Sequence, residues 1–202
     1  MDMALRMILG YDIIMSLVSS AVAFMIFYYA HRAYSVTEKK SFLLLQLGFL
    51  FAGIGLLLDS VLVLAAIALK TLHLTVMGYT AYFISTLIAY AFILGSYAVD
   101  RLEYSESSIA PLLLLIGFGA LPEGILLALA AAITIQLGLN FFMKRSMDKL
   151  LVFLAFAFIF LGHLFFMLQA LRFAIFLIAG HLARFLGFVF FLAFILRVVK
   201  LH

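Results

Sequence analysis

The chain contains no cysteine, and this absence narrows the chemistry that it can perform. Without thiols it has no disulfide, no thiolate metal site, no iron–sulfur cluster and no cysteine nucleophile. Charged residues are also scarce, at 11% of the chain, whereas soluble domains carry about 25%. The sequence lacks a basic face with interleaved aromatic residues, so nucleic acid is not expected as a partner. It also lacks a serine–histidine–acid set, a phosphate loop and an H-E-x-x-H helix, so we expect no catalytic activity of its own.

Most residues of the chain are apolar. They account for 68% of the 202 residues, and the mean hydropathy is +1.31. Only helices and closed barrels satisfy their backbone hydrogen bonds in lipid, and continuous apolar runs do not fit the two-residue alternation of a barrel. The composition therefore predicts an all-α, polytopic transmembrane helix bundle with the lipid bilayer as its partner. We expect residues 1–202 to form a single transmembrane domain.

The number of spans depends on one long apolar stretch. Five other segments can each cross a bilayer, namely residues 8–31, 41–69, 74–98, 149–171 and 173–198. Residues 108–143 would form a helix of about 54 Å, nearly twice the length of one span, so we expect a break. Pro122 is favoured at a helix start, and Pro111 marks another start by the same rule. The sequence thus predicts seven spans, with a short linking span over 108–121 and a full span over 122–143; six spans are the alternative.

Basic residues favour seven spans over six. They gather after the first span, after residue 143 and at the chain's end, as His31, Arg32, Lys39, Lys40, Lys144, Arg145, Lys149, Arg197 and Lys200. Cytoplasmic loops of membrane proteins carry an excess of Lys and Arg. Seven spans place all three groups on one side, whereas six spans separate the first from the second. We therefore expect a cell-membrane protein with its N-terminus outside and its C-terminus in the cytoplasm.

The two halves of the chain align with each other. Matched positions include Leu43 and Leu150, Gly55 and Gly162, Gly78 and Gly180, and the tetrads Ala91–Leu94 and Ala193–Leu196. They predict a parallel internal repeat, with three spans over about 8–98, the linking span, and three spans over about 122–199. Chance similarity between Leu- and Phe-rich helices is the alternative. The plan resembles that of the sugar-transporting SWEET proteins in architecture, but no motif is shared, so no functional residue is carried over.

Two histidines lie deep in the last two spans, and both follow a glycine. Counted from the turn between these spans, His163 and His181 lie about 12–14 Å from the outer end, level across an antiparallel hairpin. They could hold a b-type haem by ligation from both sides, with Arg184 paired to a propionate and Met167 as a substitute ligand. This arrangement predicts an electron-transfer membrane subunit with haem b as its cofactor.

The same histidines allow two other interpretations. His163 and His181 could bind a metal ion, but a third ligand such as Asp59 or Glu123 would have to complete the site. Alternatively, they could only hydrogen-bond to neighbouring helices. In that case the chain would be a structural subunit that packs against other membrane subunits of a complex.

A second candidate site surrounds Asp59. Ionisable residues within a span are costly and often mark a functional site, and Asp59 lies at nearly the depth of the histidines. We expect Asp59 to pair with Arg184. Tyr79 and Tyr82 occupy the positions of His181 and Arg184 in the repeat alignment. Together these residues outline a polar pocket in the outer half of the bundle, which predicts a small-solute or ion/proton carrier.

Overall fold

The computed structural model describes residues 3–102, 122–169 and 174–201, and over these ranges the chain is helical, without strands. The helices are α1 (Met3–Thr37), α2 (Lys40–Leu69), α3 (Leu72–Leu102), α5 (Pro122–Met143), α6 (Met147–Leu168) and α7 (Ala174–Leu201). All six are long and apolar enough to cross a membrane, so the structure fits a multi-pass integral membrane protein. The linking span expected over 108–121 lies outside the described residues, and the count of seven spans stays a prediction.

Local chemistry explains two of the helix starts. Pro122 opens α5, where its missing N–H is not needed, and Glu123 follows in the first turn. Ser146 precedes α6, and its hydroxyl accepts a hydrogen bond from the backbone N–H of Lys149 at 3.3 Å. The turn between α2 and α3 is tight because Lys70 adopts a left-handed conformation with φ of 55°.

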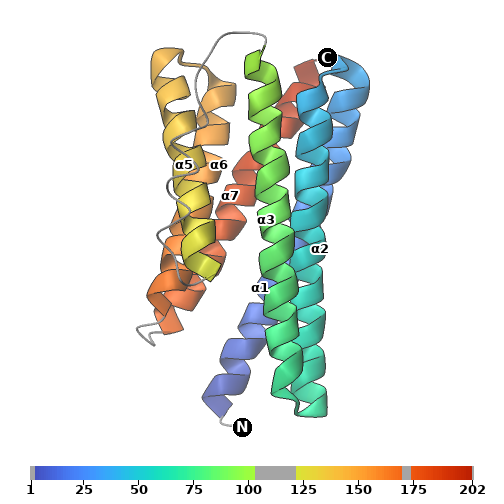
Figure 1. The fold of residues 1–202 in the computed structure, drawn as a ribbon, viewed down its shortest axis with the longest axis vertical. Coiled ribbons are helices and arrows are strands. Elements are labelled where there is room, and N and C mark those ends of the chain that lie inside the picture. The colour runs from blue at the N-terminus through green and yellow to red at the C-terminus, as the bar shows by residue number, and fades with distance from the viewer. Residues whose placement is uncertain (1–2, 103–121, 170–173, 202) are drawn as a thin grey trace.

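The helices form a bundle (Figure 1), and basic residues gather at one of its ends. Helices α1, α3, α5 and α7 run in one direction, α2 and α6 run in the other, and the chain termini lie at opposite ends. We call the end that holds the α1–α2 turn, the α5–α6 turn and the C-terminus the basic end. Basic residues at this end include Lys39, Lys40, Lys144, Arg145 and Lys200. We call the other end, where α5 begins and α6 ends, the opposite end.

The extent of packing differs between the helix pairs of this bundle. Helix α2 packs against α1 and α3, α6 packs against α5 and α7, and α1 packs against α7. The contact between α3 and α5 is much smaller. Among the described residues, the bundle is therefore firmly joined on its α1–α7 side and only lightly joined between α3 and α5.

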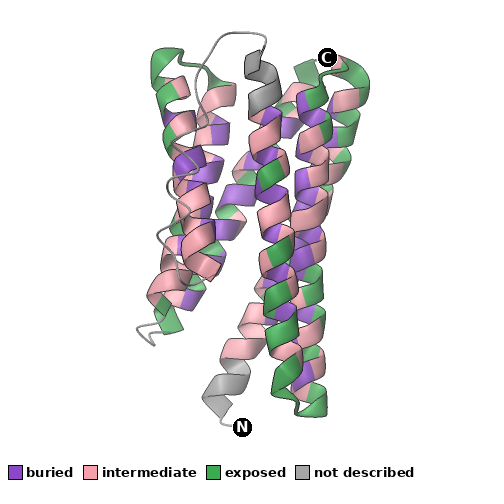
Figure 2. Cartoon of the chain, in the orientation of Figure 1, coloured by how far each residue is buried: buried purple, intermediate pink, exposed green. Residues whose placement is uncertain are grey.

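Aromatic side chains fill the interior toward the basic end. Phe49, Phe156 and Phe191 are fully buried, with the ring of Phe191 4.6 Å from that of Phe49 and 5.8 Å from that of Phe156. Buried positions lie on the helix sides that face one another (Figure 2). Large apolar side chains, including Ile14, Leu64, Ile84, Ile135 and Ile175, are exposed on the outside. An apolar outer surface of this kind suits contact with lipid.

Candidate functional site

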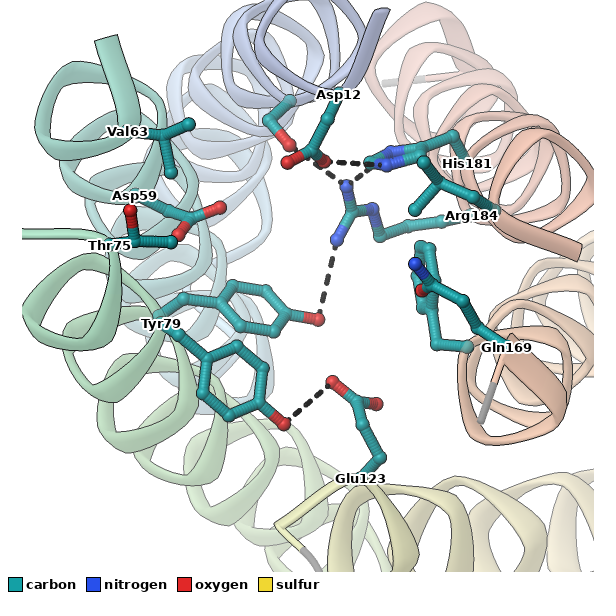
Figure 3. A pocket seen from close by; sticks show the side chains of 13 residues that line it. Asp12, Asp59, Val63, Thr75, Tyr79, Glu123, Gln169, His181 and Arg184 are labelled. Carbon is teal, nitrogen blue, oxygen red and sulfur yellow. Dashed lines mark hydrogen bonds and ion pairs between the residues drawn. The ribbon is translucent and has the colours of Figure 1, made fainter. Parts of the chain in front are cut away.

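A cavity of about 350 Å³ lies in the half of the bundle nearer the opposite end (Figure 3). All six described helices line it. The polar lining residues are Asp12, Ser16, Asp59, Thr75, Tyr79, Tyr82, Glu123, Gln169, His181 and Arg184, and the apolar ones are Val63, Phe166 and Leu177. A water molecule occupies about 30 Å³ in the liquid, so the space is large enough for a small organic molecule.

Negative charge dominates the cavity. Its carboxylates come from Asp12 on α1, Asp59 on α2 and Glu123 on α5, whereas Arg184 on α7 supplies one guanidinium. Asp59 makes no hydrogen bond or ion pair with any described residue, and its carboxylate points into the cavity (Figure 3). The other two acids are engaged, since Asp12 contacts His181, and Glu123 contacts Tyr79 and His163.

Arg184 is the centre of one hydrogen-bond network. It is buried, and its guanidinium donates to the hydroxyls of Ser16 at 3.2 Å and Tyr82 at 3.3 Å. It also contacts Nδ1 of His181 at 2.9 Å. The guanidinium lies 5.6 Å from the ring centre of Tyr82 and 5.1 Å from that of Phe166, within range for cation–π attraction. One cation is thus held by three helices, α1, α3 and α7.

This network fixes the protonation state of His181. A guanidinium can only donate hydrogen bonds, so Nδ1 of His181 accepts from Arg184 and carries no proton. The ring proton is therefore on Nε2, which lies 2.7 Å from Oδ1 of Asp12. These two atoms lie close together but are not aligned as a hydrogen bond.

His163 belongs to a second network, behind the cavity wall. It is buried, with 2% of its surface exposed, and it does not line the cavity. Its Nδ1 lies 2.9 Å from Oε2 of Glu123, and its Nε2 lies 2.6 Å from the hydroxyl of Tyr90. The other oxygen of Glu123 accepts a hydrogen bond from Tyr79 at 3.3 Å. A chain of polar groups thus leads from the cavity through Glu123 and His163 to Tyr90.

The side chains as placed do not fit a haem between the two histidines. All four ring nitrogens face other groups, and the ring of Phe166 packs edge-on against both imidazoles, with centroids at 6.5 Å from His163 and 5.0 Å from His181. A methyl group at Gly162 would lie 3.2 Å from the carbonyl oxygen of Gly180, so these glycines bring α6 and α7 together. A haem would need the helices further apart. Met167 is half-buried on α6 and does not line the cavity. The haem hypothesis stays a prediction that these contacts do not support.

A metal site at His163 and His181 has no better support. Within the described part of the chain, no three His, Asp or Glu side chains are grouped so that they could hold a metal ion. The two histidines contact different acids, Glu123 and Asp12. The two histidines therefore belong to separate histidine–carboxylate pairs and do not share an acidic ligand.

The structure brings together the four residues of the predicted pocket. Asp59, Tyr79, Tyr82 and Arg184 all line one cavity, and His181, predicted as a haem or metal ligand, lines it too. The expected ion pair between Asp59 and Arg184 is absent from the ion pairs of the described residues, because the guanidinium turns toward other partners.

Sequence reasoning missed three participants. From the sequence, Asp12 and Tyr90 were given no role in the pocket, and among the candidate sites Glu123 was considered only as a third metal ligand. A usable signal existed for Asp12, which lies inside the apolar segment 8–31. Glu123 follows Pro122 in the first turn of α5, where an acid suits the helix dipole, and this position does not reveal its contacts with Tyr79 and His163.

Comparisons of this chain with protein-family models, with curated proteins and with solved structures give no match.

Proposed function

We propose that this protein is a membrane carrier for a small organic cation, which binds in the cavity beside Asp59. The observation that carries the proposal is that the Asp59 carboxylate has no hydrogen-bond or ion-pair partner among the described residues, in a cavity lined by three acids and one guanidinium. A cleft lined mainly by one sign of charge concentrates ligands of the other sign. Ionisable groups that face a cavity inside a membrane protein commonly mark the path of a solute.

Several features favour an organic cation over a bare metal ion. The three acids come from different helices, and no metal-binding group of three occurs among the described residues. The ring of Tyr79 also lines the cavity, and aromatic faces attract ammonium groups. A chain with an ammonium group at each end could contact two separated carboxylates. We therefore choose 1,4-diaminobutane as the probe.

We further propose that the cavity opens to the outside of the cell. The basic residues near the α1–α2 turn, near the α5–α6 turn and at the end of α7 all lie at the basic end (Figure 1). The positive-inside rule assigns that end to the cytoplasm. The N-terminus would then be outside and the C-terminus inside, which requires an odd number of spans and supports seven.

Contacts near the cavity support the internal repeat. The alignment equates Asp59 with Phe166 and Gly78 with Gly180. A methyl group at Gly78 would lie 3.1 Å from Oδ1 of Asp59, and one at Gly180 would lie 2.7 Å from the ring of Phe166. Equivalent residues thus meet at equivalent places in the α2–α3 and α6–α7 hairpins.

Two further contacts repeat in the same way. Gly55 packs against the backbone of Tyr82, and its equivalent Gly162 packs against that of Arg184. Tyr79 donates to an acid on α5, the first helix of the second half. Its equivalent His181 contacts an acid on α1, the first helix of the first half. Each half of the chain thus contacts an acid on the first helix of the other half. A two-fold axis along the membrane normal, passing through the cavity, would produce this pair of contacts.

Binding to the purified protein in lipid nanodiscs tests the proposal. Calorimetry should detect binding of 1,4-diaminobutane but not of succinate, a dianion of similar length. Asp59→Asn should weaken diamine binding about tenfold or more, which corresponds to about 1.4 kcal/mol. Asp148→Asn makes the same chemical change in an exposed ion pair with Arg197 and should leave binding unchanged. Equal effects of the two substitutions, or tighter binding of succinate, would contradict the proposal.

A further inference from the structure

The two buried histidines differ in their capacity to take up a second ring proton. Nδ1 of His181 faces an N–H of Arg184 at 2.9 Å, so a proton on that nitrogen would meet a donor and a positive charge. Nε2 of His163 faces the hydroxyl of Tyr90 at 2.6 Å. A hydroxyl can either donate or accept, so this contact survives whether or not Nε2 carries a proton.

The other nitrogen of His163 is suited to both states as well. Nδ1 lies 2.9 Å from Oε2 of Glu123, and a carboxylate can accept a hydrogen bond from Nδ1–H or take up its proton. His163 can therefore lose one proton through Nδ1 while Nε2–H keeps its contact with the Tyr90 hydroxyl. His181 has no such freedom.

Glu123 connects His163 to the cavity. The carboxylate lines the cavity, and the imidazole lies behind it. Other described helices also place charged or titratable groups around this pair or across the cavity: Asp12 on α1, Asp59 on α2, Tyr79, Tyr82 and Tyr90 on α3, and His181 and Arg184 on α7. A cation that enters the cavity adds positive charge beside Glu123 and competes with a protonated His163 for the same carboxylate.

We propose that the Glu123–His163 pair holds one proton while the cavity is empty and releases it when the organic cation binds, so that the carrier exchanges cation for proton. This inference rests on the proposed function. On release, the Nδ1–H bond of the imidazolium breaks as the Glu123 carboxylate accepts the proton, and the carboxyl group then passes the proton to cavity water. The neutral ring keeps Nε2–H, which donates to the oxygen of the Tyr90 hydroxyl.

Counting protons during diamine binding tests the exchange. Calorimetry at pH 6.5 with 1,4-diaminobutane is repeated in buffers of different ionisation enthalpy. The observed binding enthalpy is plotted against the ionisation enthalpy of the buffer, and the slope gives the number of protons released. The wild-type protein should release about one proton for each diamine bound, and His163→Gln should release almost none while still binding the diamine. His73→Gln changes an exposed histidine and should behave as the wild type.

The outcomes separate this inference from the proposed function. Diamine binding without proton release in the wild type, or undiminished release in His163→Gln, would overturn the exchange and leave the proposed function intact. Absence of diamine binding to the wild type would overturn both.

A spectroscopic measurement avoids dependence on the folding of His163→Gln. In protein labelled with ¹⁵N-histidine, the substitutions H31Q, H73Q and H202Q leave only the signals of His163 and His181. Before diamine is added, the ring of His163 should be an imidazolium, and the ring of His181 should be a neutral Nε2–H tautomer. Diamine should convert the imidazolium to the neutral form without changing the other ring. Two rings that are neutral throughout would contradict the proposal.

Discussion

At the scale of single residues, most ionisable side chains inside the bundle contact polar groups on other helices. Asp59, His163, His181 and Arg184 stand out because each is ionisable within an apolar segment. Which groups they contact depends on helix rotation and on distance across the bundle, and the sequence does not specify either. Arg184 was therefore paired with Asp59 at the sequence level, whereas its long side chain reaches Ser16, Tyr82 and His181 instead.

Arg184→Lys should destabilise the protein, because an ammonium group does not reproduce the planar set of donors that binds three groups. Hydrogen bonds between membrane helices contribute about 0.6 kcal/mol each, so we expect a loss of about 1–2 kcal/mol. At about 2–4 °C for each kcal/mol, the thermal midpoint should fall by several degrees. Arg197→Lys, at an exposed ion pair, is the matched control and should change the midpoint little. Equal midpoints for the two variants would rule out a structural role for the Arg184 network.

At the scale of helices, apolar length and proline placement were good guides. The predicted span 122–143 has the bounds of α5, and 41–69 differs from α2 by one residue. The first span was predicted too short, as 8–31, because α1 continues to Thr37. In this extension Ala33 is buried, and the hydroxyl of Thr37 donates to the carbonyl of Ala33, so the helix persists beyond its apolar part.

Glycines set the closest approach between α6 and α7. A methyl group at Gly187 would lie 2.7 Å from the carbonyl oxygen of Ala155 and 3.2 Å from the backbone nitrogen of Ile159. Neither backbone atom can move without shifting α6.

Gly187→Ala should therefore push α7 away from α6 and destabilise the protein by about 1–3 kcal/mol, as overpacking usually does. Thermal unfolding in detergent measures the effect. Gly10→Ala is the control, because a methyl group there would meet nothing within 4 Å. A Gly187→Ala protein as stable as the Gly10→Ala protein would show that the helices are not in close contact at this point.

At the scale of the whole molecule, the bundle is filled toward its basic end and hollow toward its opposite end. Phe49, Phe156 and Phe191 close the interior on one side, and the cavity occupies the other. Composition predicted a membrane bundle, and six helices long and apolar enough to span a membrane confirm that much. The seven-span count and the repeat stay predictions, since the linking span lies outside the described residues.

The absence of cysteine makes the orientation simple to test. Single cysteines at Thr71, between α2 and α3, and at Ser146, between α5 and α6, place one thiol at each end of the bundle. In intact cells, a membrane-impermeant maleimide should label Thr71→Cys. Ser146→Cys should be labelled only after permeabilisation. The reverse pattern would place the cavity on the cytoplasmic side, and labelling of both variants in intact cells would contradict the bundle topology.

The central claim is that the cavity carries an organic cation across the membrane through the charge of Asp59. Uptake of radiolabelled 1,4-diaminobutane into proteoliposomes tests it most directly. The wild-type protein and Asp148→Asn should accumulate the diamine at similar rates, and Asp59→Asn should do so at least tenfold more slowly. Uptake by the wild type no faster than by protein-free liposomes, or undiminished uptake by Asp59→Asn, would contradict the account.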